Sequence, residues 1–249
     1  MGKETIKVGL IGKSLGHSFS KGFFADYFQQ HALSHWSYGN FEMPEDAITD
    51  FVKTTDLVGF NITIPYKERI LQEMDELSPE VEAIGAMNTA VRLPNGSWKG
   101  YNTDIIGIAN SLKPFLESQH ENALILGTGG AAKAVKYVLE SLGVATRYVS
   151  RTKVEPHFTY EEVNEHMMQH FKLIVNCTPL GTAPNIQENP SLPYSALTPE
   201  HLLFDLIYNP AETRFMQLGK EQGATCINGL TMLHEQALAA FDLWKSAQV

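Results

Sequence analysis

A short apolar run followed by a glycine-rich loop and a helical segment constrains the fold of this chain most strongly. Residues 123–126 predict a buried strand, Gly127-Thr-Gly-Gly-Ala-Ala132 a tight turn, and the residues up to 142 a helix that Gly143 ends. The first glycine permits the turn, the second lets a ligand approach the backbone, and a small third residue lets the helix pack on the sheet. The helix N-terminus then offers N–H groups to phosphates. The pattern predicts a dinucleotide site; the alternative is a tight turn without a ligand.

Strand-like and helix-like segments alternate along the rest of the chain, which indicates an α/β fold with a mostly parallel sheet. The further expected strands are residues 7–11, 37–41, 58–64, 89–92, 97–100, 146–149, 173–176, 203–205 and 225–227. The further expected helices are residues 20–31, 44–53, 79–85, 105–117 and 232–245. Asn95-Gly96 predicts a type I′ hairpin turn, and residues 179–199 a long loop.

Length and charge limit the classes of partner. The 249 residues, 43% of them hydrophobic, suit one large domain or two small ones. With 19 Lys plus Arg against 28 Asp plus Glu, the formal net charge is -9. We therefore expect no nucleic-acid partner and no anionic membrane partner, and a small anionic substrate would need local groups to hold it.

Cysteine and histidine usage points to a reduced compartment and no metal. Cys177 and Cys226 are too few for a disulfide framework, although one bridge stays open. The nine histidines show no metal-ligand spacing. No signal peptide and no apolar stretch of about 18 residues is present, so we expect a cytoplasmic protein.

The residues after the strand at 146–149 distinguish the two nicotinamide cofactors. An NAD site usually has Asp or Glu there for the ribose 2′-hydroxyl, whereas this chain has Ser150-Arg151-Thr152-Lys153. A guanidinium can hold a 2′-phosphate through two hydrogen bonds, hydroxyls add donors, and we expect no carboxylate nearby to repel the phosphate. The segment favours NADP; the alternative is a solvated basic turn.

Neutral polar residues follow the apolar segments of the first half, namely Ser18, Ser20, Asn61, Thr63, Asn88 and Asn102. Because carboxyl ends of parallel strands form a ligand crevice, they suit a small polyhydroxylated molecule. Lys67 can act there as general acid or base, and Asp104 can pair with it. The alternatives are a surface lysine, an N-cap of a helix from Ile105 for Asp104, helix caps for the serines and turns for the asparagines.

These motifs together resemble those of the shikimate dehydrogenase family, in the same order over most of the chain. The matching segments are Gly12-x-x-x-Gly-His17-Ser18-x-Ser20, Asn61-Ile-Thr63-Ile-Pro65-Tyr-Lys67, Gly85-Ala-Met-Asn88-Thr89, Gly100-Tyr-Asn102-Thr103-Asp104-x-x-Gly107, Gly127-Thr-Gly-Gly-Ala131, Ser150-Arg151-Thr152, Asn176-Cys-Thr178-Pro179-x-Gly181, Asp205-x-x-Tyr208-x-Pro210-x-x-Thr213 and Gly229-x-x-Met232-Leu233-x-x-Gln236. The ordered set is specific, although no single motif is.

The resemblance implies a two-domain α/β fold with the active site in the cleft between the domains. Residues 1–104 would form an N-terminal α/β substrate domain, and the C-terminal helix, residues 229–249, would return to it. Residues 105–228 would form a Rossmann-type NADP-binding domain. The implied activity is the reversible reduction of 3-dehydroshikimate to shikimate by NADPH, towards chorismate and the aromatic amino acids.

The resemblance also implies roles for single residues. Lys67 would exchange a proton with the substrate oxygen, and Asp104 would orient Lys67 and the substrate. The substrate carboxylate would be held by Ser18, Ser20 and Tyr208, and the ring hydroxyls by Asn61, Thr63, Asn88, Asp104 and Gln236. The cofactor would contact Gly127, Thr128, Gly129, Gly130, Ala131, Ser150, Arg151, Thr152, Lys153, Leu206 and Gly229.

The chain departs from the family pattern at a few positions. Lys21 and Phe24-Ala25 stand where the family usually has Pro and His-Asn, Ser150 replaces Asn, and Thr182 replaces Met. Use of quinate, aminoshikimate or NAD is one alternative, and a non-catalytic NADP-binding protein is another. Retention of both Lys67 and Asp104 argues against a non-catalytic protein. We expect a monomer or a homodimer.

Overall fold

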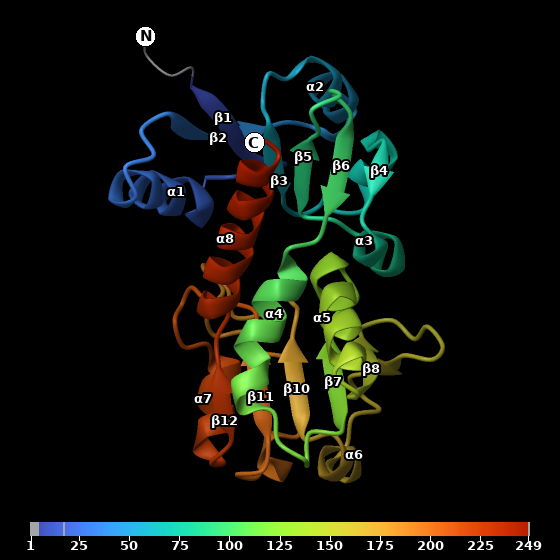
Figure 1. Cartoon of the computed structure of the whole chain (residues 1–249). Coiled ribbons are helices and arrows are strands. Elements are labelled where there is room, and N and C mark those ends of the chain that lie inside the picture. Colours follow the sequence, from blue (N-terminus) through green and yellow to red (C-terminus); the bar gives the residue numbers. More distant parts are fainter. Residues whose placement is uncertain (1–4, 17, 249) are drawn as a thin grey trace. The chain divides into compact units, whose positions relative to one another are not determined.

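In the computed structural model, which describes residues 5–16 and 18–248, the chain forms two compact units. Unit 1 comprises Met1–Thr103 with Ala237–Val249, and unit 2 comprises Asp104–Gln236. Each unit has its own six-stranded sheet (Figure 1). Residues 229–236, expected with the first domain, belong to unit 2, where Met232 packs against Gly107.

Unit 1 is built on a mixed sheet of order β2-β1-β3-β5-β6-β4. Its strands are β1 (Ile6–Gly12), β2 (Trp36–Glu42), β3 (Gly59–Ile62), β4 (Glu76–Leu77), β5 (Thr89–Arg92) and β6 (Trp98–Tyr101). β1 pairs in parallel with β2 and β3, whereas β5 runs antiparallel to β3 and β6. The expected strands are confirmed, and the two residues of β4 are too few to give a periodic signal.

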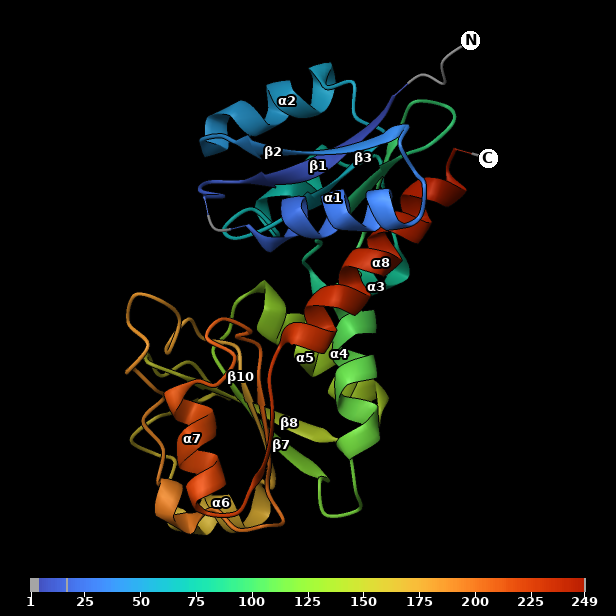
Figure 2. The ribbon, with the colours of Figure 1, turned by 90° about the vertical axis from the view of Figure 1, so that its left-hand side faces the viewer.

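Helices cover both faces of this sheet. α1 (Phe19–Gln30) and α2 (Ile48–Thr54) lie on opposite faces (Figure 2), and α3 (Pro79–Ile84) follows β4. The face with α1 also receives the last turns of α8 (Leu230–Ser246), where Trp244 is fully buried and its indole N–H donates to the Ala90 carbonyl (3.0 Å). A Cβ on Gly59 would lie 2.1 Å from the Trp244 ring, so the indole occupies the space that glycine leaves. The C-terminal helix is therefore part of the core of unit 1.

The β5–β6 hairpin differs from the expected type I′ turn. That turn needs positive φ at both central residues, but among the described residues Gly96 has φ 89° and Asn95 is not in that region. The Gly96 N–H donates to the Leu93 carbonyl (2.8 Å), so Pro94 and Asn95 are the central residues of a turn that Gly96 follows. The expected turn type is wrong because Pro94 fixes its own φ near -65°.

Unit 2 is an all-parallel sheet of order β12-β11-β10-β7-β8-β9. Its strands are β7 (Asn122–Leu126), β8 (Ala145–Ser150), β9 (Phe158–Thr159), β10 (Leu173–Asn176), β11 (Leu202–Asp205) and β12 (Thr225–Ile227). Counted from β7, this is the 3-2-1-4-5-6 order of a Rossmann fold, with the order reversing between β7 and β10. The predicted fold class, an α/β chain with a Rossmann-type unit, is confirmed.

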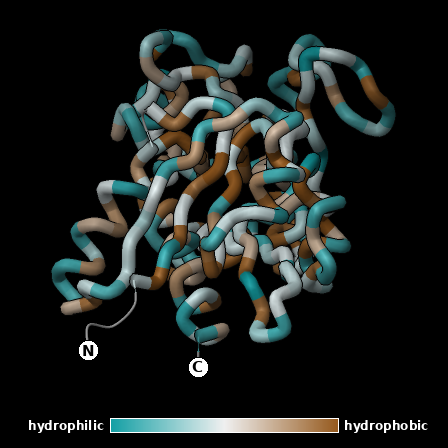
Figure 3. Tube along the Cα trace, turned by 90° about the horizontal axis from the view of Figure 1, so that it is seen from above, coloured by the Kyte–Doolittle hydropathy of each residue, from teal (hydrophilic) through white to brown (hydrophobic). Residues whose placement is uncertain are grey.

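Helices cover both faces of the second sheet. α4 (Asp104–Leu112) and α5 (Gly130–Ser141) pack on one face, and α6 (Glu165–His170) and α7 (Arg214–Glu221) on the other (Figure 2). Along the trace, hydrophobic stretches alternate with hydrophilic ones, and several of the outlying loops are hydrophilic (Figure 3). The first helix of the unit is shorter than expected, because it ends at Leu112, just before Pro114.

Candidate active site

The serine candidates lie where β1 leads into α1. The loop is held at Leu15, whose N–H donates to the Glu42 carboxylate (2.5 Å) and whose carbonyl accepts from the Ser18 N–H (2.9 Å). Ser18 is the N-cap residue of α1, but its side chain makes no capping bond, and its Oγ is buried with no partner among the described residues. Ser20 lies in the first turn, so capping by either serine hydroxyl is wrong. A buried hydroxyl without a protein partner suits a ligand oxygen. His17 lies outside the described residues.

Five buried polar residues form what we call the Asn61–Asn88 cluster: Tyr38, Asn61, Asn88, Thr89 and Thr103. The Tyr38 hydroxyl donates to Asn61 Oδ1 (2.9 Å), and Asn61 Nδ2 donates to the Asn88 carbonyl (3.2 Å) and to Thr89 Oγ1 (3.1 Å). Asn88 Oδ1 accepts from the Thr103 N–H (2.7 Å) and from the hydroxyls of Thr103 and Thr89 (both 3.1 Å). Both amide hydrogens of Asn61 are therefore used inside unit 1, which makes Asn61 a support for Asn88.

Burial raises the pKa of Tyr38, and the Ser20 hydroxyl beside it offsets part of that rise. The tyrosine therefore stays a neutral donor to Asn61. The Tyr38 hydroxyl thus connects Ser20 on α1 to the other residues of the Asn61–Asn88 cluster.

The backbone of the Thr63–Lys67 segment is fixed from both sides. The Tyr66 N–H donates to the Thr63 carbonyl (3.0 Å), and the buried Tyr66 hydroxyl donates to the Met43 carbonyl (2.7 Å). The Lys67 carbonyl accepts from the Met87 N–H (2.9 Å). Lys67 itself is half-buried, which is unusual for a surface lysine.

Asp104 is the first residue of α4 and not the residue before it, so the expectation that it caps a helix beginning at Ile105 is wrong. Its side chain is buried, with 4% exposed. It follows Thr103, whose N–H is bound to Asn88, and a carboxylate in a first helical turn is favoured by the N–H groups there. Asn102 donates to the Ala86 carbonyl (2.8 Å), while its Oδ1 is buried without a partner among the described residues.

The glycine loop of unit 2 connects β7 to α5. Gly127 has φ 100°, and its N–H donates to the Val149 carbonyl (2.9 Å). Gly129 is the N-cap residue of α5, and a Cβ there would meet no atom within 4 Å, so the space over this backbone is open. The first turn of α5 holds no acidic residue, and Ala132 is buried in the core. The residues present fit a pyrophosphate, with Thr128 between the glycines and Gly130 and Ala131 opening the helix.

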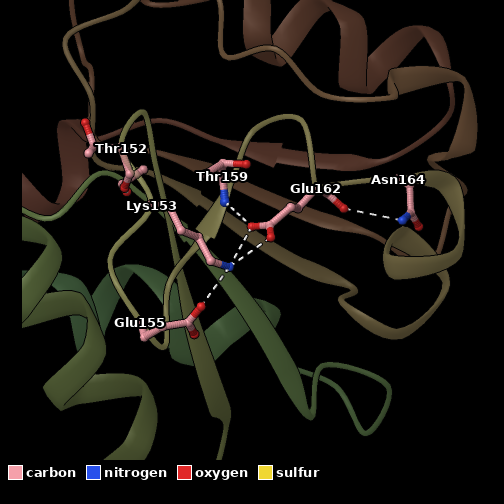
Figure 4. A network of polar contacts seen from close by, with 7 residues as sticks. Thr152, Lys153, Glu155, Thr159, Glu162 and Asn164 are labelled. Carbon is pink, nitrogen blue, oxygen red and sulfur yellow. Dashed lines mark hydrogen bonds and ion pairs between the residues drawn. The ribbon is translucent and has the colours of Figure 1, made fainter.

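In the segment after β8, Lys153 forms ion pairs with two glutamates (Figure 4). Lys153 Nζ lies 2.8 Å and 3.0 Å from the two carboxylate oxygens of Glu162 and 3.5 Å from Glu155. Glu162 also accepts from the Thr159 N–H (2.7 Å) in β9. The expectation of no nearby carboxylate is wrong, because the unexpected strand β9 brings Glu162 back to Lys153.

Arg151 differs from its neighbour. It is exposed and has no hydrogen bond or ion pair within the described part of the chain. The Ser150 hydroxyl donates to the Thr152 carbonyl, which folds the turn around it. Of the two cations expected at a 2′-phosphate, Arg151 is therefore the available one.

Two backbone segments of unit 2 meet at Leu206 and Gly229. A Cβ on Gly229 would lie 2.1 Å from the Leu206 carbonyl oxygen, and the Gly229 N–H donates to the Ile207 carbonyl (3.1 Å). Tyr208 is half-buried, which raises its pKa. Gln236 Nε2 donates to the Leu233 carbonyl (2.8 Å) within α8. The structure thus places these residues in unit 2, and Ser18, Ser20, Asn61, Thr63, Lys67 and Asn88 in unit 1.

Asp205, at the end of β11, is a site feature that sequence reasoning missed. Its carboxylate is fully buried and accepts from Asn176 Nδ2 (3.0 Å), the Ile207 N–H (3.1 Å) and the Thr213 hydroxyl (2.5 Å). Burial raises its pKa to about 6, and these donors limit the rise. The available signal was its place in Asp205-x-x-Tyr208, directly after an apolar strand.

Across residues 5–16 and 18–248, no three His, Cys, Asp or Glu side chains are grouped so that they could hold a metal ion. In the same part of the chain, no helix is long and apolar enough to cross a membrane.

Comparison with known proteins matches both units. Residues 10–90 match the family model of the shikimate dehydrogenase substrate binding domain. A shikimate dehydrogenase (NADP(+)) of Desulforamulus reducens is 34% identical over 97% of this chain and 90% of its own length. A shikimate dehydrogenase solved with NADP+ is 31% identical, with a TM-score of 0.86 over 97% of this chain and 90% of that one.

A third relative is the shikimate 5-dehydrogenase of Thermus thermophilus, solved in complex with NADP(H) and shikimate. It is 29% identical, with a TM-score of 0.83 over 97% of this chain and 94% of that chain. Similarity of this extent covers the Rossmann-type unit as well as the residues that carry the Asn61–Asn88 cluster. The chain belongs to the shikimate dehydrogenase family.

Proposed function

We propose that this protein is an oxidoreductase that reversibly reduces 3-dehydroshikimate to shikimate with NADPH, a step towards chorismate and the aromatic amino acids. One observation carries the proposal: a single chain holds an open glycine loop on a Rossmann-type sheet and a buried polar cluster beside a fixed lysine segment. The near full-length similarity to enzymes named shikimate dehydrogenase (NADP(+)) supports it.

Lys67 supplies the proton in this proposal. Reduction of a ketone places negative charge on its oxygen, and a lysine ammonium there donates a proton and takes it back in the reverse direction. Asp104 orients the ammonium and accepts a hydrogen bond from the substrate. The backbone contacts of Lys67 hold the segment, so the side chain does not have to be positioned by the substrate alone.

Hydroxyl and amide groups hold the substrate. Ser18, Ser20 and Tyr208 donate to its carboxylate, which compensates for the negative net charge of the whole chain. The ring hydroxyls are bound by Thr63, Asn88 and Gln236, with Asn61 supporting Asn88 from behind. Neutral donors in a buried setting suit an acid with several hydroxyls, because none of them adds a charge to desolvate.

The cofactor residues are those of the glycine loop and of the segment after β8. When bound, NADP supplies or accepts the hydride. The loop N–H groups at the start of α5 bind the pyrophosphate, Arg151 binds the 2′-phosphate, and Leu206 and Gly229 border the nicotinamide. Arg151 has no ion-pair partner in the part of the chain that the structure describes, which favours NADP over NAD.

Absorbance at the NADPH band tests the proposal. Purified protein is mixed with shikimate and NADP, and in parallel with quinate and with NAD. We expect turnover with shikimate and NADP and much slower turnover with the other pairs. Absence of turnover with every pair would rule out the enzyme activity, and faster turnover with quinate or NAD would transfer the protein to a sister activity.

We further propose that the protein acts in the cytoplasm on small molecules, with no nucleic-acid or membrane partner, as a monomer or homodimer. Light scattering during size-exclusion chromatography measures the mass in solution, against 27.7 kDa for one chain.

A further inference from the structure

Asp205 is a buried carboxylate at the end of β11. It is 0% exposed, and all three of its hydrogen-bond donors are uncharged groups: the Asn176 amide, the Ile207 N–H and the Thr213 hydroxyl. No Lys, Arg or His side chain forms an ion pair with it among residues 5–16 and 18–248. A charge buried in this way costs stability, because water solvates it better than three neutral donors do. Because titratable groups in such environments are often found at functional sites, we look for a functional role of Asp205.

The sheet order places Asp205 on the nicotinamide side of the proposed cofactor site. Arg151, which follows β8, serves the adenosine 2′-phosphate, and the loop after β7 serves the pyrophosphate. A dinucleotide then continues to the other side of β7, over the carboxyl ends of β10 and β11. Asn176 and Asp205 are the last residues of those two strands.

The two redox forms of the cofactor differ in charge at this end. The oxidised nicotinamide ring is a cation, and the reduced ring is neutral. A buried anion is poorly screened by salt, so it attracts a nearby cation strongly and a neutral ring hardly at all.

We propose that the buried negative charge of Asp205 strengthens the binding of oxidised NADP+ relative to the binding of NADPH. The inference rests on the proposed function, since it needs a nicotinamide at the carboxyl ends of β10 and β11. The charge would change the relative affinities of the enzyme for the two cofactor forms and would leave the overall equilibrium of the reaction unchanged.

The titratable groups around Asp205 are uncharged at pH 8, so Asp205 carries the main charge there. Cys177 after β10, Cys226 on β12 and Tyr194 in the loop before β11 interact with it electrostatically. Burial raises the pKa of all three, so they are neutral at pH 8. Asp205, with a pKa of about 6, is ionised at pH 8 and protonated at pH 5.

The experiment measures the dissociation constants of NADP+ and NADPH by titration calorimetry, without turnover. Asp205→Asn keeps the shape and removes the charge. At pH 8 we expect it to weaken NADP+ by about ten-fold, equivalent to ~1.4 kcal/mol, and to change NADPH by less than about two-fold. Its melting temperature should not fall, because a buried charge is removed.

Thr213→Ser is the matched control, because it keeps the hydroxyl donor to Asp205 and the charge and changes only the packing beside them. We expect an unchanged ratio of the two constants, and a melting curve checks that the variant is folded. The wild-type protein gives a second measurement: its preference for NADP+ should shrink between pH 8 and pH 5, whereas that of Asp205→Asn should stay flat. The ratio cancels titration of the 2′-phosphate, which both forms carry.

The outcomes are distinguishable. Equal weakening of both forms by Asp205→Asn, or an equally changed ratio in Thr213→Ser, overturns the inference, because geometry and not charge would then explain the effect. A wild-type protein that binds neither form overturns the proposed function instead.

Discussion

At the scale of single residues, the role proposed for Lys67 predicts that its loss affects catalysis more than substrate binding. We expect Lys67→Ala to lower kcat by roughly 10²-fold or more, the scale of a lost general acid, and to change KM for shikimate little, because hydroxyls and amides hold the substrate. Initial rates over a range of shikimate concentrations measure both constants. Lys53→Ala, an exposed lysine on α2, is the control. Near-normal turnover of Lys67→Ala would remove this lysine from the mechanism.

Arg151 and Lys153 give a second prediction at this scale. The sequence offers both cations to a 2′-phosphate, whereas in the structure Lys153 is already paired with a carboxylate. Arg151→Ala should raise KM for NADP by about ten-fold or more, the loss of one charged pair to phosphate, and leave KM for NAD nearly unchanged. Lys153→Ala should have the smaller effect, since its ammonium already pairs with Glu162. Equal effects of Arg151→Ala on both cofactors would contradict a 2′-phosphate site.

The sequence predicts which residues belong to the candidate site better than it predicts what each one does. Ser18 follows the apolar strand β1 and Thr63 follows β3, and that local pattern is readable. The saturated amide of Asn61 and the Lys153–Glu162 pair depend on partners that are distant in sequence or lie on an unexpected strand. Such roles follow from packing, and no single-sequence signal carries them.

At the scale of elements, the glycines at the two ends of α5 differ in backbone conformation. Gly129 has φ -75° and open space, so Gly129→Ala should change the free energy of unfolding by less than about 1 kcal/mol and weaken NADP binding strongly, because the added methyl stands where the pyrophosphate approaches. Urea unfolding and NADP titration measure the two effects.

Gly143, just past the other end of α5, is the matched control. Its φ is 82°, and a Cβ there would also meet open space. Gly143→Ala should therefore destabilise by about 1–2 kcal/mol through the left-handed backbone and leave NADP affinity unchanged. The loop would lose its assignment as a cofactor site if both variants bound NADP as well as the wild type.

Elements with a long apolar pattern are predictable here, and short ones are not. Strands such as β7 and β10 are runs of buried residues, and their limits agree with the sequence within one residue. β9 has two residues, which are too few to show any period, and neither α6, with six residues, nor α7, with eight, is expected from the sequence. The turn type of the β5–β6 hairpin failed because Pro94 outweighs the Asn95-Gly96 signal.

At the scale of the whole molecule, two buried histidines of unit 2 couple its stability to pH. The Thr198 N–H donates to His201 Nδ1 (3.0 Å), so Nε2 carries the proton and donates to the Met168 carbonyl (2.8 Å). His120 is held in the same way, by the Glu117 N–H (2.9 Å) and the Glu200 carbonyl (3.2 Å). A second proton on either ring would face an N–H donor, and burial lowers the pKa of both below 6.5.

The sign of the effect follows from this lowering. Below about pH 6.5 the histidines bind protons in the unfolded chain but not yet in the folded state. Their contribution to stability is therefore complete above that pH and is lost as the pH falls through their folded pKa. Each can reduce the free energy of unfolding by at most about 1.4 kcal/mol per pH unit. Asp205 acts in the opposite direction, since its pKa is raised from 3.8 to about 6 and its protonation restores stability between those values.

Urea unfolding of the whole chain between pH 8 and pH 5 measures the slope. We expect the free energy of unfolding to fall below pH 6.5, less steeply in His201→Gln and more steeply in Asp205→Asn, because the first removes a proton that destabilises and the second removes one that stabilises. His166→Gln, on the exposed face of α6, should keep the wild-type slope. A slope that neither His201→Gln nor Asp205→Asn changes would mean that acid acts on this molecule elsewhere, and that neither the neutral tautomer of His201 nor the Asp205 carboxyl is what links its stability to protons.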